Sequence, residues 1–320
     1  MATQLHIVTG KGGTGKTTVA AAMAMALAGK GKRVLLCEVE GRQGIAQLFD
    51  VAPLPYEERQ VAVGLGGGEV FALAIDAEAA LLEYLQMYYR LGRAGKALDR
   101  FGIIDFATTI APGVRDVLLT GKMYEAAKRQ VNGTYSYDAV VLDAPPTGRI
   151  TRFLNVNAEV AGLAKVGPIR RQADAIMQML RAQTTRVHLV TVLEEMPVQE
   201  TVDTISELVA AHLPIGHVIV NLVKPPLLDE STGAALRNGS LTESAVAASL
   251  KRVSLDATDA AALLVGGEAH LVRQLLQEAQ RGVLLTEANA PTAELPYLSD
   301  GIDLGGLFDL AEELKTTGIL

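Results

Sequence analysis

HIVTGKGGTGKTTVA, residues 6–20, joins a β-branched apolar run to a glycine-rich turn and then to an alanine-rich stretch. Gly10, Gly15, Lys16 and Thr17 have the spacing of a phosphate-binding loop, a motif that follows a strand and opens a helix. Strand-forming residues precede the turn and a helical pattern follows it, so the context fits the motif. The sequence therefore predicts that this turn binds the phosphates of a nucleotide.

The predicted loop residues are Gly10, Lys11, Gly12, Gly13, Thr14, Gly15, Lys16, Thr17 and Thr18. Glycines let backbone N–H groups turn toward phosphate oxygens, and the N-terminus of the helix adds a positive partial charge. We expect Lys16 to reach the β and γ phosphates of ATP and the Thr17 hydroxyl to bind Mg²⁺. Lys11 has no role in the generic motif, so its presence at the first variable position needs a separate explanation.

Apolar, β-branched runs alternate with helical patterns along most of the chain. The runs cover residues 5–10, 32–40, 69–76, 137–145, 185–193, 215–223 and 292–298. Strands that alternate with helices pair in parallel through right-handed crossovers. We therefore expect an α/β fold with a doubly wound, mostly parallel sheet flanked by helices, the fold of P-loop NTPases, in a single domain over residues 1–320.

Two helical segments interrupt this alternation, at residues 76–131 and 227–285. Core strands are predicted on both sides of each segment, so both are expected to be insertions on the core. An apolar stripe at helical spacing in the first segment consists of Leu81, Leu85 and Tyr88, with Leu82 and Tyr89 on the next ridge. The stripe either packs on the core or forms an exposed groove for a client or partner.

The loop, with its additional lysine, resembles the deviant phosphate loop of a known group of ATPases. The group includes MinD, ParA, the nitrogenase iron protein and the ArsA/tail-anchored-protein-targeting family. In these relatives the early lysine reaches across a dimer interface to the partner's nucleotide, in the manner of an arginine finger. The resemblance therefore implies a dimer in which Lys11 acts in trans, while Lys16 acts on the nucleotide of its own chain.

DAPPTGR, residues 143–149, distinguishes among the branches of this group. It resembles the second switch of the ArsA/tail-anchored-protein-targeting family, Asp-x-Ala-Pro-Thr-Gly-His, with arginine in place of the final histidine. The resemblance implies that Asp143 lies near Mg²⁺, through water, and that Pro146, Thr147 and Gly148 sense the γ-phosphate. MinD and ParA do not carry this form.

Shorter matches extend the resemblance to the rest of the chain. Within EVEGRQGIAQLF, residues 38–49, Glu40 takes the position of the aspartate that orients the attacking water in the family's first switch. Glutamate is one methylene longer than aspartate, and Glu38 falls where MinD and ParA carry another acid. Asn221, at the end of a strand, and Pro296, in ELPYL, lie at positions where relatives contact adenine.

Composition restricts the other sites and partners. The net charge of −7 and the aromatic content of 4% argue against a nucleic-acid partner. Cys37 is the only cysteine, so the zinc-binding Cys-x-x-Cys pairs of eukaryotic relatives and the metalloid thiolates of arsenite pumps are both missing, and no zinc is expected. The most apolar helix, residues 18–29, falls short of the ~20 residues that span a bilayer. We expect a cytoplasmic protein, with transient association with a membrane.

The resemblance implies a Mg-ATP-dependent dimeric switch ATPase with Lys11, Lys16 and Glu40 as catalytic residues. It would couple its nucleotide state to binding of a hydrophobic client or membrane protein. The dimer is either homomeric or formed with a related ATPase chain. Three alternatives stay open: the energising subunit of an anion or metalloid exporter, a weakly active nucleotide-binding subunit that partners a paralogue, and a partitioning ATPase of the ParA/MinD kind.

Overall fold

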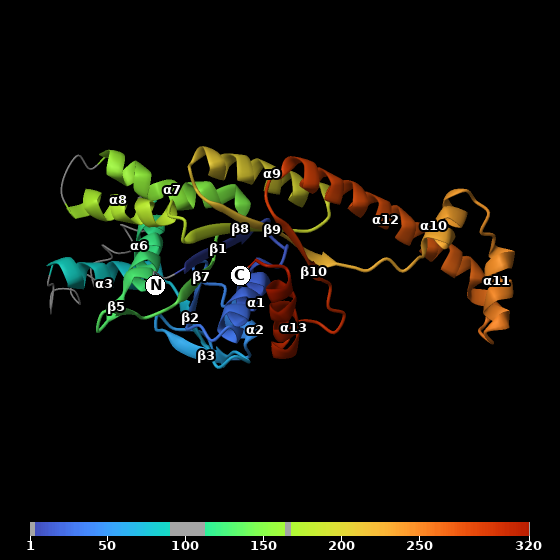
Figure 1. Cartoon of the computed structure of the whole chain (residues 1–320), viewed down its shortest axis with the longest axis horizontal. Coiled ribbons are helices and arrows are strands. Elements are labelled where there is room, and N and C mark those ends of the chain that lie inside the picture. The colour runs from blue at the N-terminus through green and yellow to red at the C-terminus, as the bar shows by residue number, and fades with distance from the viewer. Residues whose placement is uncertain (1–3, 90–112, 164–167, 320) are drawn as a thin grey trace.

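An eight-stranded sheet forms the centre of the molecule (Figure 1). The computed structural model describes residues 4–89, 113–163 and 168–319 of the chain. The strand order is β10-β9-β8-β1-β7-β2-β4-β3, and only the β3–β4 pair within this described sheet is antiparallel. The strands are β1 (Gln4–Gly10), β2 (Val34–Glu38), β3 (Arg59–Val63), β4 (Glu69–Ala74), β7 (Ala139–Asp143), β8 (Thr185–Thr191), β9 (Ile215–Val223) and β10 (Thr292–Pro296). The expected doubly wound, mostly parallel sheet is therefore confirmed.

One edge strand and one short hairpin were not predicted from the sequence. β3 lies at the edge of the sheet and its side chains are exposed or half-buried, so it lacks the continuous apolar run of a central parallel strand. The hairpin of β5 (Gln130–Val131) and β6 (Thr134–Tyr135) has only two residues in each strand. Neither element has a hydrophobic pattern long enough to predict it from the sequence.

Helices cover both faces of the sheet (Figure 1). The helices of one face are α1 (Lys16–Gly29), α2 (Gly44–Leu48) and α13 (Leu304–Thr316), and those of the other are α6 (Val114–Lys128), α7 (Thr147–Leu163), α8 (Pro168–Leu180) and α9 (Glu195–Ala210). Every residue of α1 from Val19 to Ala28 is buried, because the helix lies between the sheet and α13. Alanine favours the helix and its small side chain allows neighbouring elements to approach closely on all sides.

Strand register determines which loops meet at the carboxyl edge of the sheet. β7 lies between β1 and β2, with Asp143 paired to Val8 of β1 and to Glu38 of β2. The three parallel strands therefore end side by side. The phosphate-binding loop follows β1, the first-switch segment follows β2 and DAPPTGR begins at the end of β7. This edge of the sheet is where ligands bind in open α/β folds.

The two predicted helical segments lie at opposite ends of the molecule (Figure 1). The first contains α3 (Ala77–Tyr89) and α6, and of its predicted apolar stripe only Leu81 and Leu82 have described side chains. Leu85, Tyr88 and Tyr89 lie outside the described side chains. The second contains α10 (Glu230–Arg237), α11 (Glu243–Arg252) and the long α12 (Ala260–Glu287), which extends from the core as an arm. Among the described helices none is both long and apolar enough to cross a membrane.

Three histidines from neighbouring strands stack inside the sheet. His188 lies between His6 and His217, with ring centroids 5.4 and 5.9 Å away. The backbone N–H of His217 donates to Nδ1 of His188, so the neutral His188 ring carries its proton on Nε2, 3.1 Å from Nδ1 of His6. Burial lowers the pKa of His6 to about 4 and the pKa of His188 well below 6.5. The stack is therefore stable only when its rings are neutral.

Acid should destabilise the fold through this stack. A histidine whose folded pKa is depressed contributes stability that is present above its unfolded pKa of 6.5 and is lost as the pH falls toward the folded value. For His6 the free energy of unfolding should fall by about 2 kcal/mol between pH 6.5 and pH 5. Urea denaturation at a series of pH values measures this slope.

The control for the acid prediction is the exposed histidine His212. His188→Gln should flatten the pH dependence of unfolding, whereas His212→Gln should leave it unchanged. Asp143, whose pKa is raised to about 6 by burial, acts with the opposite sign below pH 6. One carboxyl offsets only about 1.4 kcal/mol over one pH unit, so a wild-type stability that does not decline between pH 6.5 and pH 5 contradicts the prediction.

Candidate nucleotide site

The phosphate-binding loop connects the last residue of β1 to the first residue of α1. Gly10 has no room for a side chain, since an added Cβ would lie 2.1 Å from the carbonyl oxygen of Val190. Gly13 and Gly15 have φ values of +90° and +85°, a region that favours glycine. Gly12 and Gly13 border open space on their Cβ side. The backbone of the predicted loop is therefore shaped as an open concavity at a helix N-terminus, as anion binding requires.

Thr17 and Asp143 join this loop to the second switch. The Thr17 hydroxyl donates a hydrogen bond of 2.6 Å to Oδ2 of Asp143. Lys16, at the first position of α1, is buried, and burial lowers its pKa although the charges of Asp143 and Glu40 oppose that shift. The structure thus brings together the lysine, hydroxyl and carboxylate that the sequence predicts for phosphate and metal binding.

One oxygen of the Asp143 carboxylate has no hydrogen-bond partner among the described groups. Its Oδ1 is buried and makes no hydrogen bond to any described group, and burial raises the pKa of the carboxyl to about 6. A buried carboxylate without a full set of partners is costly, and a divalent cation compensates that cost. Hydroxyl and carboxylate oxygens are also the donors that Mg²⁺ prefers. The residues present therefore fit the predicted Mg²⁺ site.

Lys11 contacts a residue of its own chain. Its ammonium donates to Oε1 of Glu200 on α9 at 2.5 Å, and Oε2 of the same carboxylate accepts a 2.9 Å hydrogen bond from the Thr147 hydroxyl. These bonds, with the Lys11 charge, hold the pKa of Glu200 below its usual value. Both the Lys11 and Glu200 side chains keep about a third of their surface exposed, 31% and 36%. Glu200 therefore connects the phosphate loop to the first residue of α7.

The two acids of the first switch differ in their surroundings. Glu38 is buried and accepts hydrogen bonds from the backbone N–H groups of Gln43 and Ile45, so it holds the start of α2. Glu40 is half-buried and faces the site, 3.6 Å from a nitrogen of Arg149. Its other carboxylate oxygen lies 3.2 Å from a nitrogen of the exposed Arg42, so among the described groups Glu40 is paired with two arginines and not with the backbone.

Arg149 links three segments of the site. One guanidinium nitrogen lies 3.6 Å from Glu40 and the other 3.7 Å from Asp116, in the first turn of α6. Arg149 stands next to Gly148, which is exposed, and near Pro146, which is half-buried. A single cation at the start of α7 therefore contacts both the first switch and the helical segment before β7.

Asn221 lies beneath the phosphate loop. Its buried side-chain amide donates a 2.9 Å hydrogen bond to the carbonyl oxygen of Thr14, and a Cβ on Gly15 would meet the same amide at 2.3 Å. The described contact of Asn221 is thus with the loop, and its predicted contact with adenine stays a prediction. The Thr14 hydroxyl donates a hydrogen bond within the loop, to the carbonyl oxygen of Lys11 at 2.9 Å.

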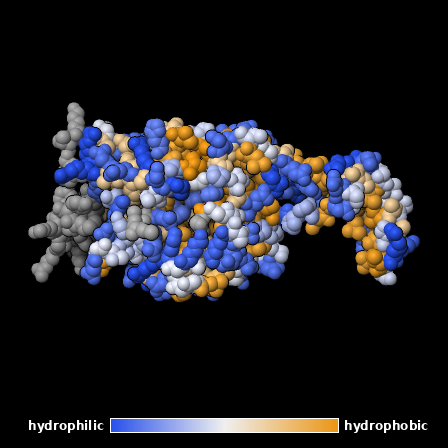
Figure 2. Space-filling model, in the orientation of Figure 1, coloured by the Kyte–Doolittle hydropathy of each residue, from blue (hydrophilic) through white to orange (hydrophobic). Residues whose placement is uncertain are grey.

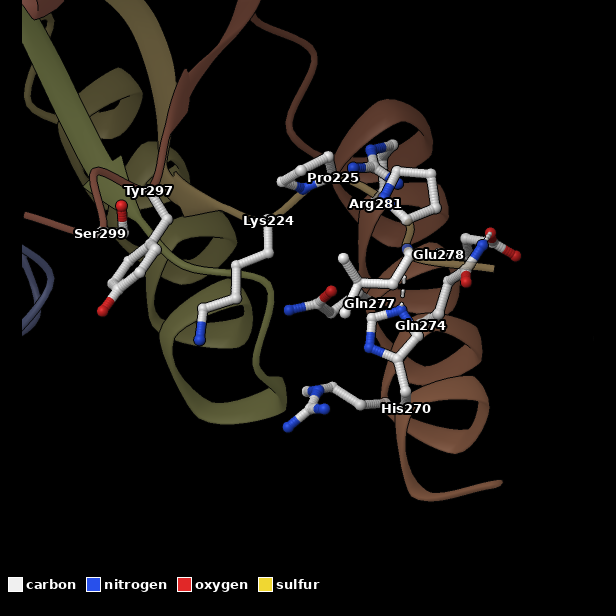
Figure 3. A pocket seen from close by; sticks show the side chains of 12 residues that line it. Lys224, Pro225, His270, Gln274, Gln277, Glu278, Arg281, Tyr297 and Ser299 are labelled. Atoms are coloured by element: carbon white, nitrogen blue, oxygen red, sulfur yellow. Dashed lines mark hydrogen bonds between the residues drawn. The ribbon is translucent and has the colours of Figure 1, made fainter. Parts of the chain in front are cut away.

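A cleft of about 500 Å³ lies between α12 and the segments that follow β9 and β10, and two of its lining residues, Lys224 and Tyr297, also line a hollow with Asn221. The Lys224 ammonium lies 4.4 Å from the centroid of the Tyr297 ring, next to the exposed Pro296. Figure 3 shows these two side chains facing Gln277 and other residues of α12 across the cleft. An aromatic ring and a cation beside the loop form a surface suited to a nucleotide base or ribose.

The sequence did not reveal three of these residues. Glu200 belongs to PVQETVD, residues 197–203, and nothing in this run shows that it contacts Lys11. Lys224 follows the Asn221 strand and Tyr297 follows Pro296, so each was adjacent to a predicted base-side residue. Their involvement depends on the pairing of β9 with β10, which sequence alone does not determine.

Known proteins are similar to this chain over nearly all of its length. A family model described as "Anion-transporting ATPase" matches residues 3–183. "ATPase BagA" of Mycobacterium tuberculosis (strain ATCC 25618 / H37Rv) is 51% identical over 319 residues, which cover 99% of this chain and 94% of that protein.

More distant relatives carry two different names. "Arsenical pump-driving ATPase" of Acidiphilium multivorum is 26% identical over 94% of this chain and 53% of that protein. "ATPase GET3" of Kluyveromyces lactis is 26% identical over 67% of this chain and 70% of that protein. The resemblance drawn from the phosphate loop and DAPPTGR is confirmed: the chain belongs to the ArsA-type family of anion-transporting ATPases.

Proposed function

We propose that this chain is a Mg-ATP-dependent switch ATPase that works as a dimer and couples its nucleotide state to a hydrophobic client or membrane partner. The observation that carries the proposal is the contact of Glu200 with both Lys11 and Thr147. It joins the residue predicted to act on the partner's nucleotide to the residue predicted to sense the γ-phosphate. A change at either residue is therefore felt by the other.

The chemistry follows from the positions of the site residues. Thr17 and Asp143 would hold Mg²⁺, which supplies charge neutralisation on the β and γ phosphates. Lys16 would bind the same phosphates, and its burial strengthens that attraction. Glu40 accepts a hydrogen bond from the attacking water and orients it toward the γ-phosphate. Lys11 leaves Glu200 on dimer closure and stabilises the developing negative charge in the opposite site.

Client binding is proposed for a groove between α3, α6, α7 and α8. The groove has a volume of about 580 Å³. Its lining includes both apolar and charged side chains, among them Leu81, Val117, Leu118, Val160 and Ile176, and Glu83, Lys122, Glu125, Lys128 and Arg129. A groove lined by apolar and charged side chains suits an amphipathic helix. The groove wall on α7 belongs to the same helix that begins at Thr147, so closure of the second switch would move it.

Export of trivalent arsenic receives no support from the side chains of this chain. The single cysteine, Cys37, is buried in β2, and burial raises the pKa of its thiol. A buried neutral thiol is neither a nucleophile nor a ligand for a soft metalloid. Transport of another anion is compatible with the fold, but no described residue favours it over the client groove.

Mixing two inactive variants tests the trans role of Lys11. Lys11→Ala should bind ATP but hydrolyse it poorly, and Lys16→Ala should fail to bind ATP, because each removes a different cation from the composite site. In an equal mixture, half of the dimers pair one variant with the other, and each mixed dimer has one complete site. ATPase activity should therefore recover to roughly a quarter of the wild-type rate.

The same measurement has a direct negative outcome. A mixture that is no more active than the sum of its separate components would show that Lys11 serves the nucleotide of its own chain. ATPase rate per subunit should also rise with protein concentration in the wild type. A rate that is independent of concentration down to the nanomolar range, together with a monomeric mass, would remove the dimer from the proposal.

Glu200→Gln should favour the ATP-bound dimer over the monomer. Glu200 holds Lys11 within its own chain, and an exposed ion pair of this kind contributes about 0.2–1 kcal/mol. Its loss should therefore increase ATPase activity at low protein concentration by about 1.4- to fivefold. The matched control is Glu207→Gln, which removes an exposed carboxylate on the same helix that accepts from Thr151 of α7. Equal effects of the two substitutions would contradict a specific restraint on Lys11.

A further inference from the structure

α12 carries an apolar stripe that faces solvent along the arm. The stripe consists of Ala262, Val265, Ala269, Val272, Leu276 and Ala279, all of them exposed. Their spacing of three, four, three, four and three residues is the repeat of a coiled-coil seam. Val265, Val272 and Leu276 are 65%, 58% and 61% exposed, which is unusual for three large apolar side chains in one row.

The stripe is not the face by which α12 packs within its own chain. Leu271, on the opposite side of the helix, is buried beside Gly233 of α10, and Leu236 of α10 approaches Gly267. Figure 1 shows α10 and α11 gathered at the far end of α12, and Figure 2 shows apolar atoms exposed along this arm and at its tip. The helix thus has one face that is packed and another that has no cover among the described residues.

Two charged residues beside the stripe, Glu268 and Arg273, favour a second copy of the same helix as its partner. In a heptad with Ala262, Ala269 and Leu276 at the a positions, Glu268 is at g and Arg273 is at the following e. Within the described parts of the chain neither side chain forms an ion pair, and Arg273 also lines the cleft between α12 and Lys224. When two identical helices associate in parallel and in register, g of one lies beside the following e of the other. Glu268 of each copy would then meet Arg273 of its partner, twice in one dimer.

We propose that α12 is a homotypic docking surface, on which the arms of two copies of this chain associate as a parallel two-stranded coiled coil. The small side chains at Ala262, Ala269 and Ala279 let the helix backbones approach closely. A parallel arrangement also leaves both sheets at the same end of the paired arms, since α12 runs from the arm tip toward the core. An antiparallel arrangement would separate them. The pairing needs no nucleotide, so it is independent of the closure proposed through Lys11.

Charge exchange tests the identity of the partner. Sedimentation velocity of the full chain without nucleotide should give a dimer at micromolar concentration. Glu268→Arg and Arg273→Glu should each weaken it by roughly fivefold, because each creates two like-charged contacts per dimer. The double substitution should restore the wild-type dissociation constant, since the pairs re-form with reversed sign. Only association between copies of the same helix predicts this restoration.

Two further variants distinguish the stripe from the rest of the helix. Val272→Asp places two charges in the seam and should weaken the dimer by on the order of a hundredfold. Leu285→Asp is the matched control, because Leu285 is 68% exposed on the same helix but lies outside the stripe. Circular dichroism and thermal melting verify that both variants fold. Equal dissociation constants for the two variants, or a wild-type chain that stays monomeric at 100 µM, would overturn the proposal.

A disulfide reports the direction of pairing. Val272→Cys should form an intermolecular disulfide rapidly under mild oxidation with copper phenanthroline, since equivalent d positions lie beside each other only in a parallel, in-register pair. The remaining cysteine, Cys37, is buried and does not interfere. Leu285→Cys provides the background rate. A Val272→Cys chain that cross-links no faster than the Leu285→Cys chain excludes the parallel seam.

Discussion

A hydrogen bond of 2.6 Å from the Thr17 hydroxyl to the Asp143 carboxylate joins the start of α1 to the end of β7. It forms because β1 and β7 are neighbours in parallel register, so that their carboxyl ends reach the same edge of the sheet. The burial of α1 on all sides then prevents the helix from moving away from that edge. The positions of the phosphate loop and of both switches follow from this one constraint. Because this bond uses only Oδ2 of Asp143, the buried Oδ1 has no hydrogen-bond partner among the described groups and could bind a cation.

The charged residues around this point divide into fixed and exchangeable groups. Lys16 and Asp143 are buried, and removal of either would leave an uncompensated charge at a cost of several kcal/mol. Lys11, Glu200 and Arg149 are partly exposed, and their ion pairs are each worth about 1 kcal/mol or less. A single phosphate oxygen competes easily with contacts of that strength. The site therefore combines buried charges that are held in place with exposed charges whose ion pairs can be exchanged at small energetic cost.

Much of the fold could be predicted because long elements have strong periodicity. The apolar patterns of the seven expected strands, and of the helix after the loop, are long enough to indicate one type of element. β3 instead has the mixed pattern of an edge strand. Asp143 was found because a local motif surrounds it. Glu200 was not assigned to the site because its contact with Lys11 spans 189 positions of sequence, and only the packing of α9 beside the loop brings them together.

Asn221 illustrates a different limit of sequence reasoning. Its position near the end of β9 places it beside the predicted phosphate loop, but the direction of its amide depends on side-chain packing. That amide lies against the backbone of Thr14, because Gly15 has no Cβ to exclude it. The loop glycine and the asparagine therefore form one unit, although 206 positions separate Gly15 from Asn221 in the chain. Motif matching identifies such residues separately and does not show that they depend on each other.

The length of α12 gives the arm a mechanical property of its own. Its 28 residues correspond to about 42 Å at 1.5 Å per residue. The core end of the helix packs against α9, the helix that carries Glu200. A rotation of about 10° at that end would displace the far end by about 7 Å, given the same 1.5 Å rise. Small rotations at the α9 end of the helix would thus become larger displacements at the tip of the arm.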